Sequence, residues 1–144
     1  MRRFLRLLLA VIVGFVAGSA VNMALISASA SLIPPPPGAD VTTMEGLRAS
    51  MHLFEPKHFL FPFLAHALGT LVGALVATLL APQRSIVPAL VVGVLFFAGG
   101  CANVAMLPSP LWFDVVDLVL GYLPFAWVGY RLAARRPPAA TAGG

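Results

Sequence analysis

Four long apolar runs constrain this chain more than any other feature of its sequence. They cover approximately residues 4–26, 59–80, 85–107 and 111–132. A helix needs about 20 apolar residues to cross the hydrocarbon core of a bilayer, so each run is long enough to span it. Only 10% of the 144 residues are charged, which leaves little material for a domain outside the membrane. We therefore expect a single all-α membrane domain, with four transmembrane helices in a compact bundle.

The positions of the basic residues predict the orientation of these helices. Arginines precede the first run, lie between the second and third runs, and follow the fourth: Arg2, Arg3, Arg6, Arg84, Arg131, Arg135 and Arg136. In four antiparallel helices these positions share one side, and the positive-inside rule makes that side cytoplasmic. Both termini, including the tail 133–144, are then expected in the cytoplasm. This asymmetry accounts for the net charge of +4, so the charge does not indicate a nucleic-acid partner.

The first apolar run follows a basic start and precedes Ala28-Ser29-Ala30, as a secretory signal peptide would. Its apolar core is longer than the roughly 7–15 residues of a signal sequence. We therefore expect the run to be retained as a true membrane helix.

A short sequence echo suggests an internal repeat. Residues 17–25 read AGSAVNMAL and residues 98–106 read AGGCANVAM, each within an apolar run. The segments 69–81 and 121–133 also match at several small and apolar positions. These matches favour a tandem repeat of two helices plus two, although apolar helices rich in Ala and Gly also match by coincidence.

Small residues recur every four positions on the first two runs. Gly14 and Gly18 lie on the first run, and Gly69 and Gly73 lie on the second. Small faces let membrane helices approach closely, so we expect these glycines to lie at helix-packing interfaces.

The connection between the first two runs, residues 27–58, is the longest. It contains four consecutive prolines, which form a stiff extended segment. In the stretch that follows, Thr42 with Glu45 fits a helical capping box. Beyond it, Met44, Leu47, Met51 and Phe54 share one helical face. We expect a short amphipathic helix at the outer membrane surface.

Five polar side chains interrupt the outer halves of the runs, within roughly two helical turns of one another in depth. They are Asn22, His66, Asn103, Asp114 and Asp117. A carboxylate at the depth of Asp117 must be paired, hydrated or protonated, and His66 is its expected partner. Two interpretations stay open: a site for a proton, a cation or a small polar ligand, or a structural pair that fixes helix register.

The sequence HLFEPKH near the second run offers possible metal ligands. His52, Glu55 and His58, with Asp114, are residue types that bind zinc, so a divalent metal is a possible cofactor. Pro56 interrupts any helix between them, and a solvated polar turn is the favoured interpretation. The sequence contains no GxSxG, Walker, HExxH or CxxC motif, and we assign no catalytic residue.

The run HLFEPKHFLFPFLAHALGTLVGA, with MLPSPLWFDVVDLVLGYLPFAWVG downstream, resembles small uncharacterised bacterial membrane proteins with four helices. The resemblance implies a bacterial inner-membrane location and carries no known activity or site residue.

Three functions are compatible with these features. The first is a non-enzymatic packing or accessory subunit in the lipid bilayer, associating with itself or with another membrane protein. The second is a small transporter or channel-like protein for protons, a cation or a small solute, using the Asn, His and Asp set. The third is a metal-binding membrane enzyme.

Overall fold

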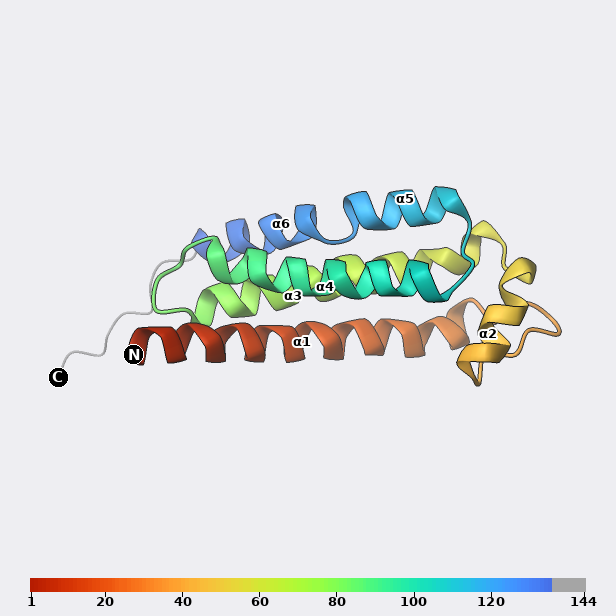
Figure 1. The fold of residues 1–144 in the computed structure, drawn as a ribbon, viewed down its shortest axis with the longest axis horizontal. Coiled ribbons are helices and arrows are strands. Elements are labelled where there is room, and N and C mark those ends of the chain that lie inside the picture. The colour runs from red at the N-terminus through yellow and green to blue at the C-terminus, as the bar shows by residue number, and fades with distance from the viewer. Residues whose placement is uncertain (136–144) are drawn as a thin grey trace.

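The computed structural model describes residues 1–135, and this part of the chain is helical with no strand. The elements are α1 (Arg2–Leu32), α2 (Met44–Ser50), η1 (Met51–Leu53), η2 (Pro56–Phe59), α3 (Leu60–Leu80), α4 (Val87–Met106), α5 (Leu111–Leu120) and α6 (Leu123–Ala134). Figure 1 shows the long helices side by side, with α2 across one end of the bundle. Arg136 and most of the expected tail 133–144 lie outside the described residues.

Four helical segments are long and apolar enough to cross a membrane. They are Arg2–Leu32, Pro56–Leu80, Val87–Met106 and Leu111–Ala134. The expected all-helical fold with four candidate membrane spans is therefore confirmed at the level of length and composition.

Helix α1 is longer than the first apolar run. We expected a loop from residue 27, but the helix continues to Leu32 because nothing before Pro34 breaks it. Ile33 leaves the helical conformation with φ of −130° and ψ of 85°, since the proline that follows disfavours a helical residue before it. The connection between the first two spans is therefore shorter than expected, because residues 27–32 belong to α1.

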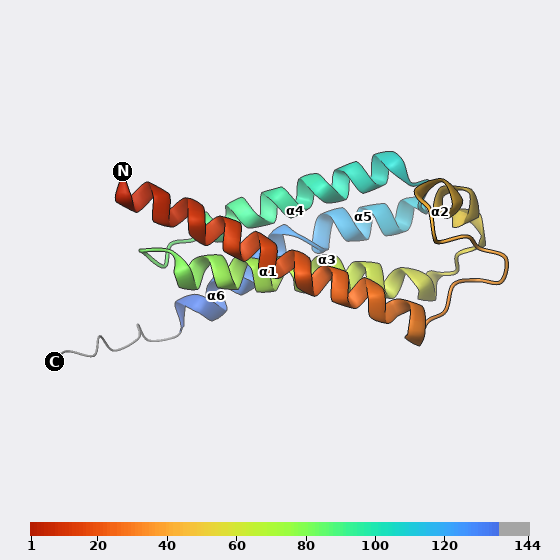
Figure 2. The same cartoon turned by 90° about the horizontal axis from the view of Figure 1, so that it is seen from below.

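Helices α1 and α3 make the most extensive helix–helix contact and cross each other (Figure 2), and their glycines lie where the two backbones meet. A Cβ atom added to Gly14 would lie 2.5 Å from the carbonyl oxygen of Gly73, and one added to Gly18 would lie 2.5 Å from that of Gly69. Backbone therefore touches backbone, and only glycine fits. The two small-residue stripes of the sequence pack against each other within one chain.

The fourth span is divided at Gly121 and Tyr122, between α5 and α6 (Figure 1). Pro124 has no N–H to donate to the carbonyl of Leu120, so the regular ladder stops there. Tyr122 has φ of −122° and ψ of −80°, outside the helical region. This break controls the direction of the Tyr122 side chain.

The α2 segment closes one end of the bundle. The helix is capped by Thr43, whose hydroxyl accepts a bond of 2.9 Å from the Gly46 N–H. The expected cap, Thr42, instead donates its hydroxyl to Asp40. Past α2, Met51 and Phe59 form a buried apolar cluster with Phe113 of α5. Leu47, Met51 and Phe54 of the expected apolar face therefore pack on the end of the bundle, whereas Met44 is exposed and the helix itself ends at Ser50.

Candidate functional site

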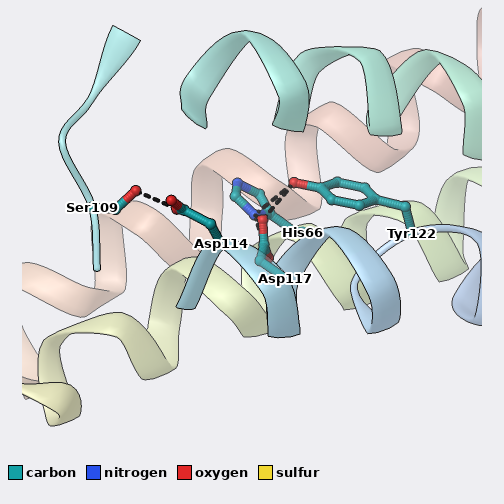
Figure 3. Close-up of polar contacts among 5 residues, drawn as sticks. All are labelled: His66, Ser109, Asp114, Asp117 and Tyr122. Atoms are coloured by element: carbon teal, nitrogen blue, oxygen red, sulfur yellow. Dashed lines mark hydrogen bonds and ion pairs between the residues drawn. The ribbon is translucent and has the colours of Figure 1, made fainter. Parts of the chain in front are cut away.

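A cluster of three polar side chains, of which Asp117 and Tyr122 are buried and His66 is partly buried, joins α3 to the fourth span. The Nδ1 atom of His66 lies 2.9 Å from each carboxylate oxygen of Asp117 and 2.9 Å from the Tyr122 hydroxyl. The Tyr122 hydroxyl donates to Asp117 Oδ2 at 2.8 Å. Figure 3 shows the three groups converging on one point. We call His66, Asp117 and Tyr122 the His66 cluster.

The helix break brings Tyr122 into this cluster. In a regular helix, residues five apart point roughly 140° away from each other, so Asp117 and Tyr122 would face different sides. The break at Gly121 turns Tyr122 back to the side of Asp117, and the two residues are 1% and 2% exposed respectively. Gly100 of α4 makes room for the ring, because a Cβ atom there would collide with the Tyr122 hydroxyl.

The hydrogen-bond pattern assigns the roles of the two imidazole nitrogens of His66. The Tyr122 hydroxyl donates its hydrogen bond to Asp117, so in its contact with Nδ1 of His66 the hydroxyl oxygen can only be the acceptor. Nδ1 therefore carries a proton and donates toward the carboxylate and the phenol. Nε2 points away from both groups (Figure 3) and has no hydrogen-bond partner among residues 1–135. The cluster thus fixes the ring by one nitrogen and leaves the other available.

A cavity of about 190 Å³ adjoins the His66 cluster beneath the α2 segment. Its polar lining includes His66, Asn103, Asp114 and Asp117. The rest of the wall is mainly apolar and comes from α1, α2, η1, α3, α4 and α5. Asp114 is half-buried and already accepts a hydrogen bond from the Ser109 hydroxyl (Figure 3). We refer to this space as the α2-end cavity.

A second hollow, of about 310 Å³, lies between α1 and α4. Ser19 and Asn22 line it from α1, and Asn103 lines it from α4. His66 and Tyr122 also line it. We call this space the α1–α4 groove. The groove and the α2-end cavity share His66, Gly100 and Asn103, so they adjoin at the imidazole.

The structure gathers the polar residues singled out in the sequence around these two spaces. His66 and Asp117 form the expected pair. Asn22 and Asn103 face the α1–α4 groove, and their amides make no hydrogen bond within the described chain. Whether a ligand or ion binds there stays a prediction.

The candidate metal ligands do not form a cluster. His52 is bonded through Nδ1 to the carbonyl of Ala49, and the Nδ1 atom of His58 accepts from the Glu55 N–H. The carboxylate of Glu55 pairs with Lys57 at 2.9 Å. The hydrogen bond from Lys57, with its charge, lowers the pKa of Glu55. Within residues 1–135, no three His, Cys, Asp or Glu side chains are placed to hold a metal ion.

Sequence reasoning missed Tyr122. Its spacing from Asp117 does not fit one helical face, which conceals its place beside the intramembrane polar residues. The available signal was local: Gly121 precedes it and Pro124 follows it, a pattern that predicts a break within an apolar helix. A polar aromatic residue at such a break is free to turn inward.

The comparisons with known proteins do not add a family to this geometry. No family model, curated protein or solved structure matches the chain.

Proposed function

We propose that this chain is a multi-pass membrane protein that binds a small ligand at His66. The observation that carries the proposal is the state of the imidazole. Asp117 and Tyr122 hold it through Nδ1, Nε2 has no partner in the described residues, and His66 lines both hollows. A carboxylate behind a histidine is the usual way to orient a ring whose other nitrogen meets a ligand.

The unpaired amides favour ligand binding over a purely structural pair. If the His66–Asp117 pair only fixed the register of the helices, it would need no hollow beside it. Here Nε2 of His66 and the amides of Asn22 and Asn103 all lack protein partners. Polar groups in an apolar surrounding are costly unless something bonds them. A ligand that bonds these three side chains would remove that cost.

The packing favours a binding site over a continuous channel. Away from α2, the core between α3, α4 and α6 is filled by Ala74, Ala89 and Ala126, each 0% exposed. The hollows at that end, near Arg3 and Arg6, share no residue with the α2-end cavity. Transport through this site, the alternative function, would require these helices to separate.

An accessory or packing subunit is the other alternative. The glycine stripes that favoured it pack α1 against α3 in the same chain. What still supports an accessory or packing role is the outward side of α1, where four large apolar residues are exposed: Leu5, Leu9, Ile12 and Val16. Lipid covers such a surface as well as a second copy or another membrane protein does. The third alternative, a metal-binding enzyme, has no ligand cluster in the described residues to support it.

We propose a bacterial inner membrane as the location, with both termini in the cytoplasm. The start of α1, the α3–α4 turn and the end of α6 lie at one end of the bundle (Figure 1). Six of the arginines, Arg2, Arg3, Arg6, Arg84, Arg131 and Arg135, belong to these segments, whereas only Arg48 and Lys57 lie toward the α2 end within residues 1–135, and this excess supports a cytoplasmic assignment. We also keep the two-plus-two repeat as a proposal. Gly18 and its counterpart Gly99 pack differently, since a Cβ atom on Gly99 would touch nothing within 4 Å.

A comparison of two histidine variants tests the proposed function. Wild-type, His66→Phe and His52→Phe proteins are purified in mild detergent, and their bound small molecules are extracted and compared by mass spectrometry. His52 is the matched control, because it is exposed and lines neither hollow. We expect a species that wild type and His52→Phe retain and His66→Phe loses. Identical extracts from three equally folded proteins would contradict the proposal.

A further inference from the structure

Resting on this proposed function, we infer the class of the ligand and its route. It is an uncharged, lipid-soluble molecule with a carbonyl or hydroxyl head, of the quinone and quinol class. It reaches His66 sideways from the bilayer, between α1 and α4. Three properties of the two hollows carry this inference: their charge, their apolar walls and the opening between the helices.

The charges around the site favour an uncharged head. Within the described chain, no Lys or Arg lines either hollow, so a carboxylate or phosphate would be buried without a counter-charge. The carboxylates of Asp114 and Asp117 already accept hydrogen bonds from Ser109, His66 and Tyr122. Where the two hollows adjoin, the remaining polar groups are Nε2 of His66 and the Asn22 and Asn103 amides; His58 lines only the α2-end cavity, and its Nδ1 is bonded to Glu55. These groups match a carbonyl or hydroxyl, which either accepts or donates.

The wall of the α2-end cavity favours an apolar ring behind that head. Met51, Phe54, Phe59, Leu107 and Phe113 line it. Aromatic and thioether side chains pack well on flat rings. A dry protein cavity of about 150 Å³ holds benzene, so about 190 Å³ suits a substituted single ring. The ring would sit under the α2 segment with its oxygen directed at His66.

The α1–α4 groove provides a route from the lipid. The two helices diverge toward the α2 end of the bundle (Figure 2). Phe15 and Met23 of α1 and Leu95 and Phe96 of α4 form apolar walls on either side. The groove meets the cavity at His66. A hydrocarbon tail attached to the ring could therefore extend through the groove while the head stays at the imidazole.

The two tryptophans of the chain allow binding to be measured at the cavity. Trp112 packs on Phe59 and Phe113, with ring centroids 5.7 and 5.9 Å apart, and both phenylalanines line the cavity. Trp127 lies on α6 beside Arg131, away from it. In Trp127→Phe protein, quenching by a bound quinone reports on the cavity. The Trp112→Phe protein is the matched control and reports quenching elsewhere.

Two probes separate the head from the tail. Duroquinone has a fully substituted ring and no long tail, and decylubiquinone has a fully substituted ring with a decyl tail. Neither ring has an open position for the Cys101 thiol to attack. Decanoate, with a charged head on a similar tail, serves as the competitor. We expect saturable quenching of Trp112 by both quinones, lost in His66→Phe, and no displacement by decanoate.

A groove-filling variant tests the route. Gly99 lines the groove, and its Cβ would meet nothing within 4 Å, so the side chain of Gly99→Phe starts in open space and can extend into the groove. Val94→Phe is the matched control, on an exposed part of α4 that lines neither hollow. We expect Gly99→Phe to weaken decylubiquinone binding about tenfold, because the tail loses its contacts, and to leave duroquinone unchanged. Val94→Phe should change neither.

The outcomes separate this inference from the proposed function. Equal decylubiquinone affinity in Gly99→Phe and Val94→Phe would overturn the lateral route, while His66-dependent duroquinone binding would still support a ligand site. Displacement of either quinone by decanoate would overturn the uncharged class. If no quinone binds, yet His66→Phe loses an extracted species that His52→Phe retains, the inference falls and the proposed function stands.

Discussion

The Nδ1 atom of His66 on α3 lies 2.9 Å from both carboxylate oxygens of Asp117 on α5. The pair therefore ties two membrane-length segments together and also sets the orientation of the imidazole. These two roles are separable by experiment. Removing Asp117 leaves His66 and Tyr122 without their buried acceptor, whereas replacing both His66 and Asp117 with apolar residues removes the imidazole without leaving it unpaired.

We expect Asp117→Leu to destabilise the fold. His66 and Tyr122 would lose a buried acceptor, and breaking such a pair from one side typically costs about 3–5 kcal/mol. The measurement is unfolding in mixtures of SDS and mild detergent, followed by circular dichroism. Asp114→Leu is the control and should cost less, because Asp114 is half-buried and holds one hydroxyl. Equal losses for the two variants would contradict the central place given to Asp117.

The double variant His66→Leu with Asp117→Leu should be more stable than Asp117→Leu alone. It leaves no imidazole without its partner, and directly contacting residues couple by about 0.5–3 kcal/mol. It should nevertheless lose His66-dependent binding entirely. A double variant that binds like wild type would show that the pair only holds the helices together.

Two adjacent glycines on α4 make opposite predictions. In Gly100→Ala the new methyl group collides with the Tyr122 hydroxyl, so the phenol must leave Asp117. We expect a loss of about 1–3 kcal/mol, as for other overpacked sites, together with weaker ligand binding. Gly99→Ala meets open space and should be neutral or slightly stabilising, because alanine favours helix. Similar behaviour of the two variants would contradict the placement of Tyr122.

The crossing of α1 and α3 predicts a strong effect at Gly18. A larger side chain there must push against the carbonyl of Gly69, since the Cβ alone would lie 2.5 Å from that oxygen. We expect Gly18→Val to lower the free energy of unfolding by about 1–3 kcal/mol. The matched control is Gly99→Val, the same change at a position facing open space. If Gly99→Val is the more damaging of the two, the crossing is not the main contact of α1.

The sequence predicts well what depends on composition along the chain. Run length and hydropathy indicated four candidate spans, and the scarcity of charge made Asp117 conspicuous. His66 followed as its partner because few ionisable groups share that depth. The spacing of Gly14, Gly18, Gly69 and Gly73 indicated close packing without saying which helix each would meet.

What the sequence could not predict depends on three-dimensional placement. Tyr122 joins the cluster only because the helix breaks beside it, and a helical projection puts it on another side. The Gly46 N–H is capped by Thr43 because Asp40 engages Thr42, a choice between neighbours that propensity does not resolve. The α1–α4 groove lies between helices that diverge toward the α2 end, and the α2-end cavity is lined by residues far apart in the sequence; no local pattern encodes either arrangement.

A buried hydroxyl on α3 should respond favourably to removal. Thr70 is 0% exposed, and its Oγ1 has no hydrogen-bond partner among the described residues. Thr70→Val keeps the shape and removes the desolvation cost, so we expect a gain of about 1 kcal/mol in unfolding free energy. Thr78→Val is the control. The Thr78 hydroxyl donates to the Ala74 carbonyl at 2.8 Å, so its removal should not raise the unfolding free energy. A loss at Thr70 would indicate that its hydroxyl has a partner in the membrane.

The proposed orientation predicts which loops react from each side of the membrane. In a Cys101→Ser background, Glu45→Cys places a thiol on α2, and Gln83→Cys places one in the α3–α4 turn at the opposite end of the bundle. On intact spheroplasts, a membrane-impermeant maleimide should label the first variant and should label the second only after permeabilisation. The reason is the positive-inside rule, because Arg84 and the flanking arginines of α1 and α6 share the end that carries Gln83. Labelling of Gln83→Cys alone on intact spheroplasts would invert the orientation, and would place the α2-end cavity on the cytoplasmic side.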